Sequence, residues 1–136
     1  MKSLLYILLI PLLSYAQEFV VVMQKNSALG NLSQAKVKMI FLKKQKMSQD
    51  ILLVPINLPP SSSIRKSFEK QVLGMSRNRL KSFWTKEHYL GHRPPLTMKS
   101  SRSTLSFVEK IDGVIGYIPA KEVNANLKIL YKWKSK

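Results

Sequence analysis

Apolar residues gather in short runs between polar turns, and the runs show two different spacings. Phe19–Met23 is a continuous apolar run rich in valine, which is typical of a buried strand. Ile64, Phe68 and Val72 recur at every fourth position, which indicates one face of a helix. Strands interleaved with helices predict an α/β fold in which helices flank a mixed sheet.

The same spacings place further elements along the chain. We expect four helices: one from Ser33 to Ile40 with Leu32, Ala35, Met39 and Ile40 inward, one from Ser61 to Gly74, one capped by Ser76 with Leu80, Phe83 and Trp84 on one side, and one opened by Ser101 or Ser103. We expect strands from Ile51 to Val54, over 97–99 and over 114–118, and a loop over 91–95. The last element is an edge strand over 127–133 with one lysine-coated face.

The first sixteen residues have the pattern of a secretory signal peptide. Lys2 precedes an apolar stretch over 3–13, and Ser14 and Ala16 are small residues of the kind that a signal peptidase reads. The apolar stretch is shorter than the roughly 20 residues that span a bilayer. The sequence therefore predicts a signal peptide over 1–16, cleavage after Ala16, and a single domain over 17–136 that is periplasmic or secreted.

The chain is strongly basic. Its 136 residues carry 23 Lys and Arg against 7 Asp and Glu, a formal net charge of +16, which becomes +15 once Lys2 is removed. Such a charge favours anionic partners, and export disfavours nucleic acid among them. Small oxyanions, anionic lipid headgroups and acidic surface polymers remain. There is no cysteine, which excludes disulfides and a lipid-anchored N-terminal cysteine.

The stretch after the Ile51 strand carries the clearest candidate chemistry. Two prolines are followed by Ser61, Ser62 and Ser63 at the start of a helix, with Arg65 in its first turn. A helix N-terminus presents unpaired N–H groups and partial positive charge, serine hydroxyls add donors, and a guanidinium binds two oxygens at once. The pattern predicts an oxyanion site. The alternative is that one serine caps the helix and the others are solvated.

Residues for catalysis are scarce. The sequence has no glycine-flanked serine, no cysteine nucleophile and no phosphate-binding glycine loop. His88 and His92 lie four residues apart beside Glu87, but Gly91 and the prolines after it break the helical turn that a metal pair at this spacing requires. We therefore expect a protein without enzymatic activity, metal site or cofactor.

Several short motifs follow one another in a recognisable order. They are Leu32-Ser33, Ile40-Phe41-Leu42, Val54-Pro55-Ile56-Asn57, Ser62-Ser63-Ile64-Arg65 with Phe68, Leu73-Gly74, Phe83-Trp84, Gly91-His92-Arg93-Pro94-Pro95 and Gly113-Val114-Ile115-Gly116-Tyr117. Their order and spacing resemble those of the short exported relatives of phosphate ABC-transporter substrate-binding proteins. The resemblance extends from Phe19 to Ile118, and the Gly113–Tyr117 motif is its most specific part.

The resemblance implies one lobe of a type II periplasmic-binding-protein fold, in which a loop rich in serine and glycine holds phosphate at a helix N-terminus. Ser61, Ser62, Ser63 and Arg65 stand at that loop here. Three features depart from the pattern: the glycine of the loop is absent, Lys43 replaces a glycine that commonly follows the Ile-Phe pair, and residues 46–50 stand where many relatives have a tryptophan-containing turn. A single lobe leaves one side of the cleft open, which dimerisation or a docked partner would cover.

The resulting prediction is an exported, non-enzymatic solute-binding protein that captures phosphate or a similar oxyanion. Lys43, Lys44 and Arg93 are expected to steer anions if they border the same mouth. An ABC permease or an anionic component of the cell envelope is the expected partner. The alternative prediction is a basic interaction module with the same fold, which grips anionic lipid, polymer or an acidic protein and no longer binds a small ligand.

Overall fold

The structure is a computed structural model that describes residues 3–8 and 16–136. Residues 1, 2 and 9–15 of the predicted signal peptide lie outside the described residues, and residues 3–8 form no helix or strand. Within the described part of the chain, no helix has the length and apolar character needed to cross a bilayer.

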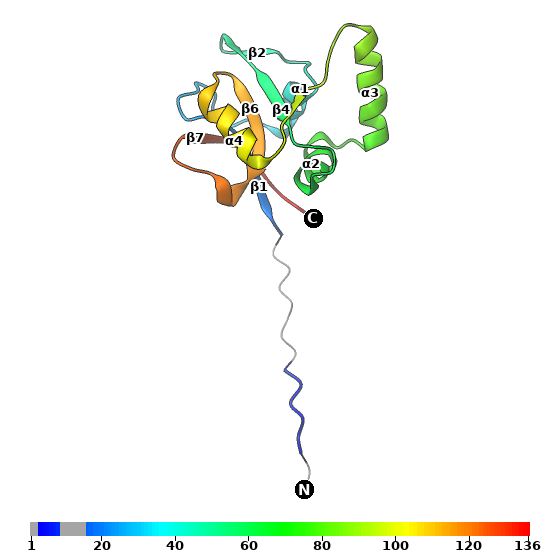
Figure 1. Ribbon diagram of the computed structural model, residues 1–136, viewed down its shortest axis with the longest axis vertical. Helices are drawn as coiled ribbons and strands as arrows, with labels where there is room; N and C mark the ends of the chain where they lie inside the picture. Colours follow the sequence, from blue (N-terminus) through cyan, green and yellow to red (C-terminus); the bar gives the residue numbers. More distant parts are fainter. Residues whose placement is uncertain (1–2, 9–15) are drawn as a thin grey trace.

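A mixed sheet of five strands forms the centre of the domain, in the order β5-β4-β6-β1-β7 (Figure 1). β4, β5 and β6 run parallel, whereas β1 is antiparallel to both β6 and β7. The strands are β1 (Glu18–Gln24), β4 (Val54–Asn57), β5 (Leu96–Thr97), β6 (Val114–Pro119) and β7 (Leu127–Lys134), and β2 (Met47–Ser48) pairs with β3 (Ile51–Leu52) in a separate hairpin. The predicted α/β class with a mixed sheet is confirmed.

Helices cover both faces of this sheet. The helices are α1 (Gln34–Phe41), α2 (Ser63–Ser67), its continuation as a π-helix η1 (Phe68–Leu73), α3 (Arg77–Tyr89), α4 (Ser101–Lys110) and a short 3-10 turn η2 (Ala120–Glu122). One apolar cluster packs α1 and η1 on Val21 and Tyr117, and the other packs α4 on Val20 and Ile118. Successive residues of β1 thus serve opposite clusters, as the alternation of a buried strand requires.

β7 is the edge strand that the alternating lysines predict, but its alternation breaks at Leu130. The register with β1 shifts between Val21 and Val22, which leaves Leu130 as the extra residue of a β-bulge. Leu127 therefore packs with α4, whereas Leu130 and Trp133 pack with the cluster on the other face. A strict period of two cannot anticipate such a switch.

Two other expectations need correction. The apolar run at Ile51 is not one strand, because β3 ends at Leu52 and β4 begins at Val54. In α1, Val37, Ile40 and Phe41 are buried, whereas Ala35 and Met39 are exposed. A short helix dense in apolar residues offers several possible inner faces, and packing against η1 selects among them.

The Gly113–Tyr117 motif matches close packing in the structure. Gly113 adopts φ 82°, and a Cβ atom there would lie 2.1 Å from the Leu52 carbonyl oxygen. At Gly116 a Cβ atom would lie 2.7 Å from the Thr104 methyl group of α4. Both positions need glycine because neighbouring atoms occupy the space of a side chain.

Candidate functional site

The serine-rich turn lies where β4 ends. β4 stops at Asn57, the chain turns through Pro59 to Ser61, and α2 begins at Ser63. β5 and β6 run parallel to β4, so the turn stands at the carboxyl end of the parallel part of the sheet. Ligands of open α/β sheets bind in this position, which makes the turn a candidate binding site.

Tyr117 of β6 fixes the start of the turn. Its hydroxyl donates to Asn57 Oδ1 at 3.0 Å and accepts the Leu58 N–H at 3.2 Å. The ring stacks on Phe68, with centroids 4.2 Å apart. Burial raises the pKa of Tyr117 well above its usual range, with smaller opposing effects of the Leu58 hydrogen bond and of the Arg65 and Arg77 charges. Tyr117 thus joins the sheet, the turn and the helix after it.

The three serines have different environments. Ser62 is the N-cap of α2, and its Oγ accepts the Arg65 backbone N–H at 3.3 Å. Ser61 and Ser63 are exposed. The capping role therefore belongs to Ser62 rather than to Ser61, where we expected the helix to begin.

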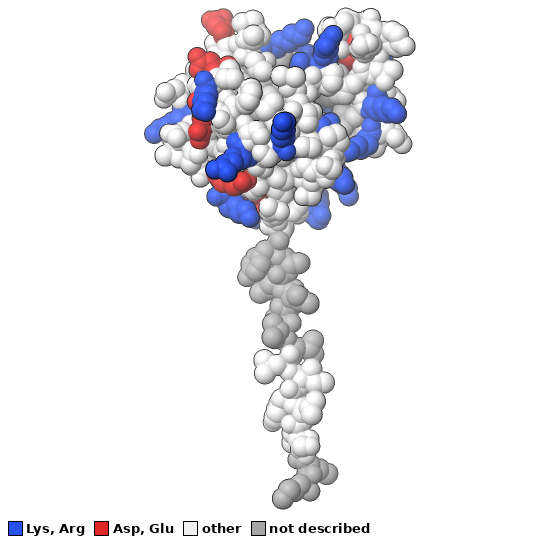
Figure 2. All heavy atoms as spheres, viewed as in Figure 1, with Lys and Arg blue, Asp and Glu red and all other residues white. Residues whose placement is uncertain are grey.

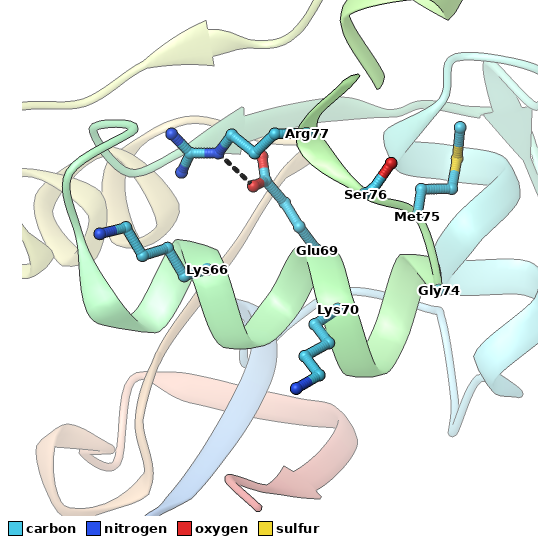
Figure 3. Close-up of a pocket in the computed structure, with 7 residues that line it drawn as sticks. All are labelled: Lys66, Glu69, Lys70, Gly74, Met75, Ser76 and Arg77. Atoms are coloured by element: carbon cyan, nitrogen blue, oxygen red, sulfur yellow. Dashed lines mark hydrogen bonds and ion pairs between the residues drawn. The ribbon is translucent and has the colours of Figure 1, made fainter. Parts of the chain in front are cut away.

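Arg65 and Arg77 both bind the carboxylate of Glu69. Arg65 Nε lies 3.0 Å from Glu69 Oε2. Arg77 Nε lies 2.8 Å from Glu69 Oε1, the pair that Figure 3 shows as a dashed line. The Glu69 side chain is only 8% exposed. Arg65 Nη1 also donates to the Leu58 carbonyl at 2.9 Å, and Arg77 Nη2 donates to the Pro60 carbonyl. The two guanidinium groups therefore hold the turn against η1.

A cavity of about 210 Å³ opens beside this ion-pair network. Asn57 and Pro60 of the turn line it, as do Arg65, Arg77 and Lys81. The only carboxylate in its lining is that of Glu69. Figure 3 shows a neighbouring hollow that shares Glu69 and Arg77 with this cavity, and there Lys70 points away from Glu69. The cavity thus gathers three cationic side chains around one buried carboxylate.

The expected steering charges do not border this cavity. Lys43 and Arg93 line a different cavity, formed by the end of α1, the start of β4 and the loop after α3. Lys44 lies over the Phe83 ring, with Nζ 5.5 Å from the centroid. The structure separates these three residues from Arg65 and places Lys43 and Arg93 together.

The two histidines lie on either side of the C-terminal end of α3. The helix stops at Tyr89, so the unbroken turn between His88 and His92 is absent, as the sequence predicts. His92 Nδ1 lies 2.5 Å from Glu87 Oε2. Among residues 3–8 and 16–136, no three side chains of the metal-binding types lie close enough together to hold an ion.

Sequence reasoning missed three members of the site: Glu69, Arg77 and Lys81. One signal was available, because Arg65 and Glu69 are spaced as neighbours on a helix. Arg77 and Lys81 come close only because the chain reverses at Gly74, which has φ 62°, before α3 begins. Reversals of this kind are set by tertiary packing and not by local spacing.

No protein-family model and no curated protein sequence matches this chain. Solved structures do. An ABC-type phosphate transport receptor from Vibrio cholerae aligns with TM-score 0.67 and 16% identity over 85% of this chain and 46% of the receptor. A phosphate ABC transporter substrate-binding protein with bound phosphate from Clostridium perfringens aligns with TM-score 0.70 and 19% identity, covering 85% and 45%.

PstS from Borrelia burgdorferi aligns with TM-score 0.63 and 14% identity, covering 85% of this chain and 47% of PstS. The chain spans less than half the length of each of these structures. The sequence resemblance and the three-dimensional likeness point to the same group of proteins. The chain therefore has the fold of phosphate ABC-transporter substrate-binding proteins over a region that fits a single-lobe relative.

Proposed function

We propose that this chain is an exported, non-enzymatic solute-binding protein that captures phosphate or a similar tetrahedral oxyanion at the turn between β4 and α2. One observation carries the proposal: Arg65, Arg77 and Lys81 line a single cavity at the carboxyl end of β4. Like-charged side chains gathered in a concave, partly desolvated site attract an anion. The likeness to a structure with bound phosphate supports the same ligand class.

The arginines retain donors for a ligand. A guanidinium has five N–H groups, and the contacts of Arg65 to Glu69 and Leu58 use two of them. Arg77 likewise uses two, for Glu69 and Pro60. Glu69 offsets part of their charge, so we expect weaker binding of phosphate than three unopposed cations would give. An oxyanion enters as a second anion beside the carboxylate.

The serines are proposed as additional donors. The Ser62 hydroxyl accepts from the Arg65 N–H, which leaves its own proton free to donate. Ser61 and Ser63 are exposed at the same turn, and the helix that begins at Ser63 adds backbone N–H groups. Of the binding set that the sequence predicts, Arg65 lines the cavity, whereas Ser61, Ser62 and Ser63 stand at the same turn outside its lining. Arg77 and Lys81 extend the set.

Export and partners belong to the same proposal. Export rests on the signal pattern over 1–16, with cleavage after Ala16. The proposed partner is an ABC permease or an anionic component of the cell envelope, and a second copy of the chain or a docked partner covers the open side of the cavity. Lys43, Lys44 and Arg93 steer anions only over a distance, because they lie outside the lining of this cavity.

Calorimetric titration with inorganic phosphate tests the proposal. Lys81→Ala removes a cation from the cavity without touching the Glu69 ion pairs, and Lys86→Ala removes one from the same helix outside it. We expect saturable binding that Lys81→Ala weakens by about five- to tenfold, since one charge at close range contributes on the order of 1 kcal/mol. Equal weakening by Lys86→Ala, or no saturable binding, would contradict a pocket.

A basic interaction module is the second candidate, and α3 favours it. Of the thirteen residues of α3 only Leu80 is buried, and the helix carries Arg79 and Lys86 on its exposed surface. Figure 2 shows Lys and Arg side chains spread over the visible face, including the side that carries α3. Binding of acidic polymer that falls steeply with salt and responds equally to many lysines supports this function over the pocket.

A further inference from the structure

The cavity that holds Lys43 and Arg93 is separate from the cavity beside Glu69. It measures about 380 Å³ and lies between the end of α1, the β2–β3 hairpin, the start of β4 and the loop after α3. Its size falls in the range of small-molecule sites, which is roughly 300–1,000 Å³. No residue named in the proposed function as an oxyanion ligand lines it.

The lining of this cavity combines apolar residues with cationic ones. The apolar residues include Ile40, Leu53 and Pro55, all of which are buried. The polar residues of the lining are Lys43, Lys46 and Arg93, together with Gln45 and His92. The apolar residues can bury an apolar group of a ligand away from water, and the cationic side chains can bind an anionic group of the same ligand.

No carboxylate belongs to the lining. Glu87 reaches this region only through His92, whose Nδ1 it contacts at 2.5 Å, and it does not line the cavity. The cavity beside Glu69 differs in this respect, because a buried carboxylate there binds two of the three cations. Three cations without a lining acid leave a site whose charge only an added anion offsets.

Lys43 is held in this cavity against two physical costs. Its backbone has φ 57°, a left-handed conformation that disfavours residues with a Cβ atom. Burial, and then the neighbouring charge of Lys46, lower the pKa of its ammonium group. The left-handed conformation closes α1, because the Lys43 N–H donates to the Ile40 carbonyl at 3.0 Å and the Lys44 N–H to the Met39 carbonyl at 2.9 Å, a C-terminal cap in which glycine is the usual residue.

We propose that this cavity binds a small organic anion with an apolar body, seated on the apolar residues of the lining with its charge at Lys43 and Arg93. Inorganic phosphate meets the cations but leaves the apolar residues uncovered, whereas a neutral apolar molecule covers the apolar residues and leaves the cations unpaired. A lining with both apolar and cationic residues therefore favours an anion with an apolar body over an inorganic anion or a neutral apolar molecule. The site does not depend on the Arg65 cavity, since the two linings share none of their cations.

Phenyl phosphate is the probe for this site. Inorganic phosphate, which has the charge without the ring, and benzyl alcohol, which has the ring without the charge, are the two controls. Calorimetric titration of the purified protein is expected to show binding of phenyl phosphate about tenfold or more tighter than either control. Under this proposal phenyl phosphate binds in the Lys43 cavity and phosphate alone in the Arg65 cavity, so Lys81→Ala should weaken the binding of phosphate and leave the affinity for phenyl phosphate unchanged. Phenyl phosphate that binds no tighter than phosphate overturns the proposal.

Lys43→Gly separates loss of the site from loss of the fold. Glycine accepts φ 57° without a Cβ penalty, so this variant removes the ammonium while easing the backbone. We expect the advantage of phenyl phosphate to disappear in Lys43→Gly and to survive in Lys44→Met, which removes the adjacent lysine that lies over Phe83. An advantage retained in Lys43→Gly overturns the proposal, whether or not phosphate binds at Arg65.

Discussion

Glu69 and Arg77, on η1 and α3, form an ion pair with Nε and Oε1 2.8 Å apart across the reversal at Gly74. Arg65 binds the other oxygen of the same carboxylate. Through the carbonyls of Leu58 and Pro60, the two arginines also hold the turn that precedes α2. The buried carboxylate thus organises the proposed site from within.

Glu69→Gln should make stability depend on added oxyanion. The change keeps the shape of the side chain but leaves two guanidinium groups without their counter-charge, and we expect a loss of about 2–3 kcal/mol in chloride. Phosphate should restore part of that loss, because it supplies the missing negative charge. Urea unfolding in the two salts at matched ionic strength measures both effects.

Asp50→Asn is the matched control for this prediction. Asp50 is exposed, and asparagine tolerates its φ of 65°. A Glu69→Gln protein no less stable than Asp50→Asn would show that the buried ion pairs add nothing to the fold.

The free energy of unfolding should fall at alkaline pH because the buried Tyr117 hydroxyl resists ionisation in the folded protein. Its pKa is raised in the folded protein, so above about pH 10, the usual tyrosine value, the unfolded chain releases this proton first. The contribution is therefore complete below pH 10 and is lost as pH rises further. Tyr117→Phe should lack this loss, and at neutral pH it should be less stable by about 1–2 kcal/mol through its missing hydrogen bonds.

The measurement is the difference in unfolding free energy between the two proteins from pH 8 to 11, a window set by the usual tyrosine pKa of about 10. Lys43, whose pKa is lowered, titrates in both proteins and cancels in the difference. A difference that stays constant across the window would contradict the account of Tyr117.

Gly116→Ala should destabilise the packing of α4 on β6. The added methyl group would meet the buried Thr104 methyl at 2.7 Å and Ile56 at 3.3 Å, and overpacking of this kind costs about 1–3 kcal/mol. Gly30→Ala is the control, because nothing lies within 4 Å of a Cβ atom there. Chemical denaturation of both variants compares them, and equal effects would mean that α4 yields to the methyl group without cost.

Lys43→Gly should stabilise the protein. Relief of the left-handed backbone is expected to raise the free energy of unfolding by about 1 kcal/mol. Lys44→Gly, at a position without a positive φ, should lower it instead. Thermal unfolding of the two variants decides the sign, and a Lys43→Gly protein less stable than the unaltered chain would remove the case for strain at this position.

Local spacing predicted most of the elements, because burial of Phe19–Met23 and Val114–Ile118 requires long apolar runs that leave a clear signal. It failed where tertiary contacts decide the outcome. The bulge at Leu130, the break between β3 and β4 and the outward Met39 depend on neighbours that are distant in sequence. For the site, the turn and Arg65 were predicted, whereas Arg77 and Lys81 join it only through the reversal after η1.

The most direct test of the central claim is thermal unfolding over a range of phosphate concentrations, with chloride at matched ionic strength as the reference. A ligand bound only by the folded state adds about 2.7 kcal/mol at a hundredfold excess over Kd. We predict a saturable rise in Tm that is specific for phosphate and absent from Arg65→Ala, whose lower stability in both salts cancels in the comparison. A rise in phosphate no larger than in chloride would contradict an oxyanion pocket.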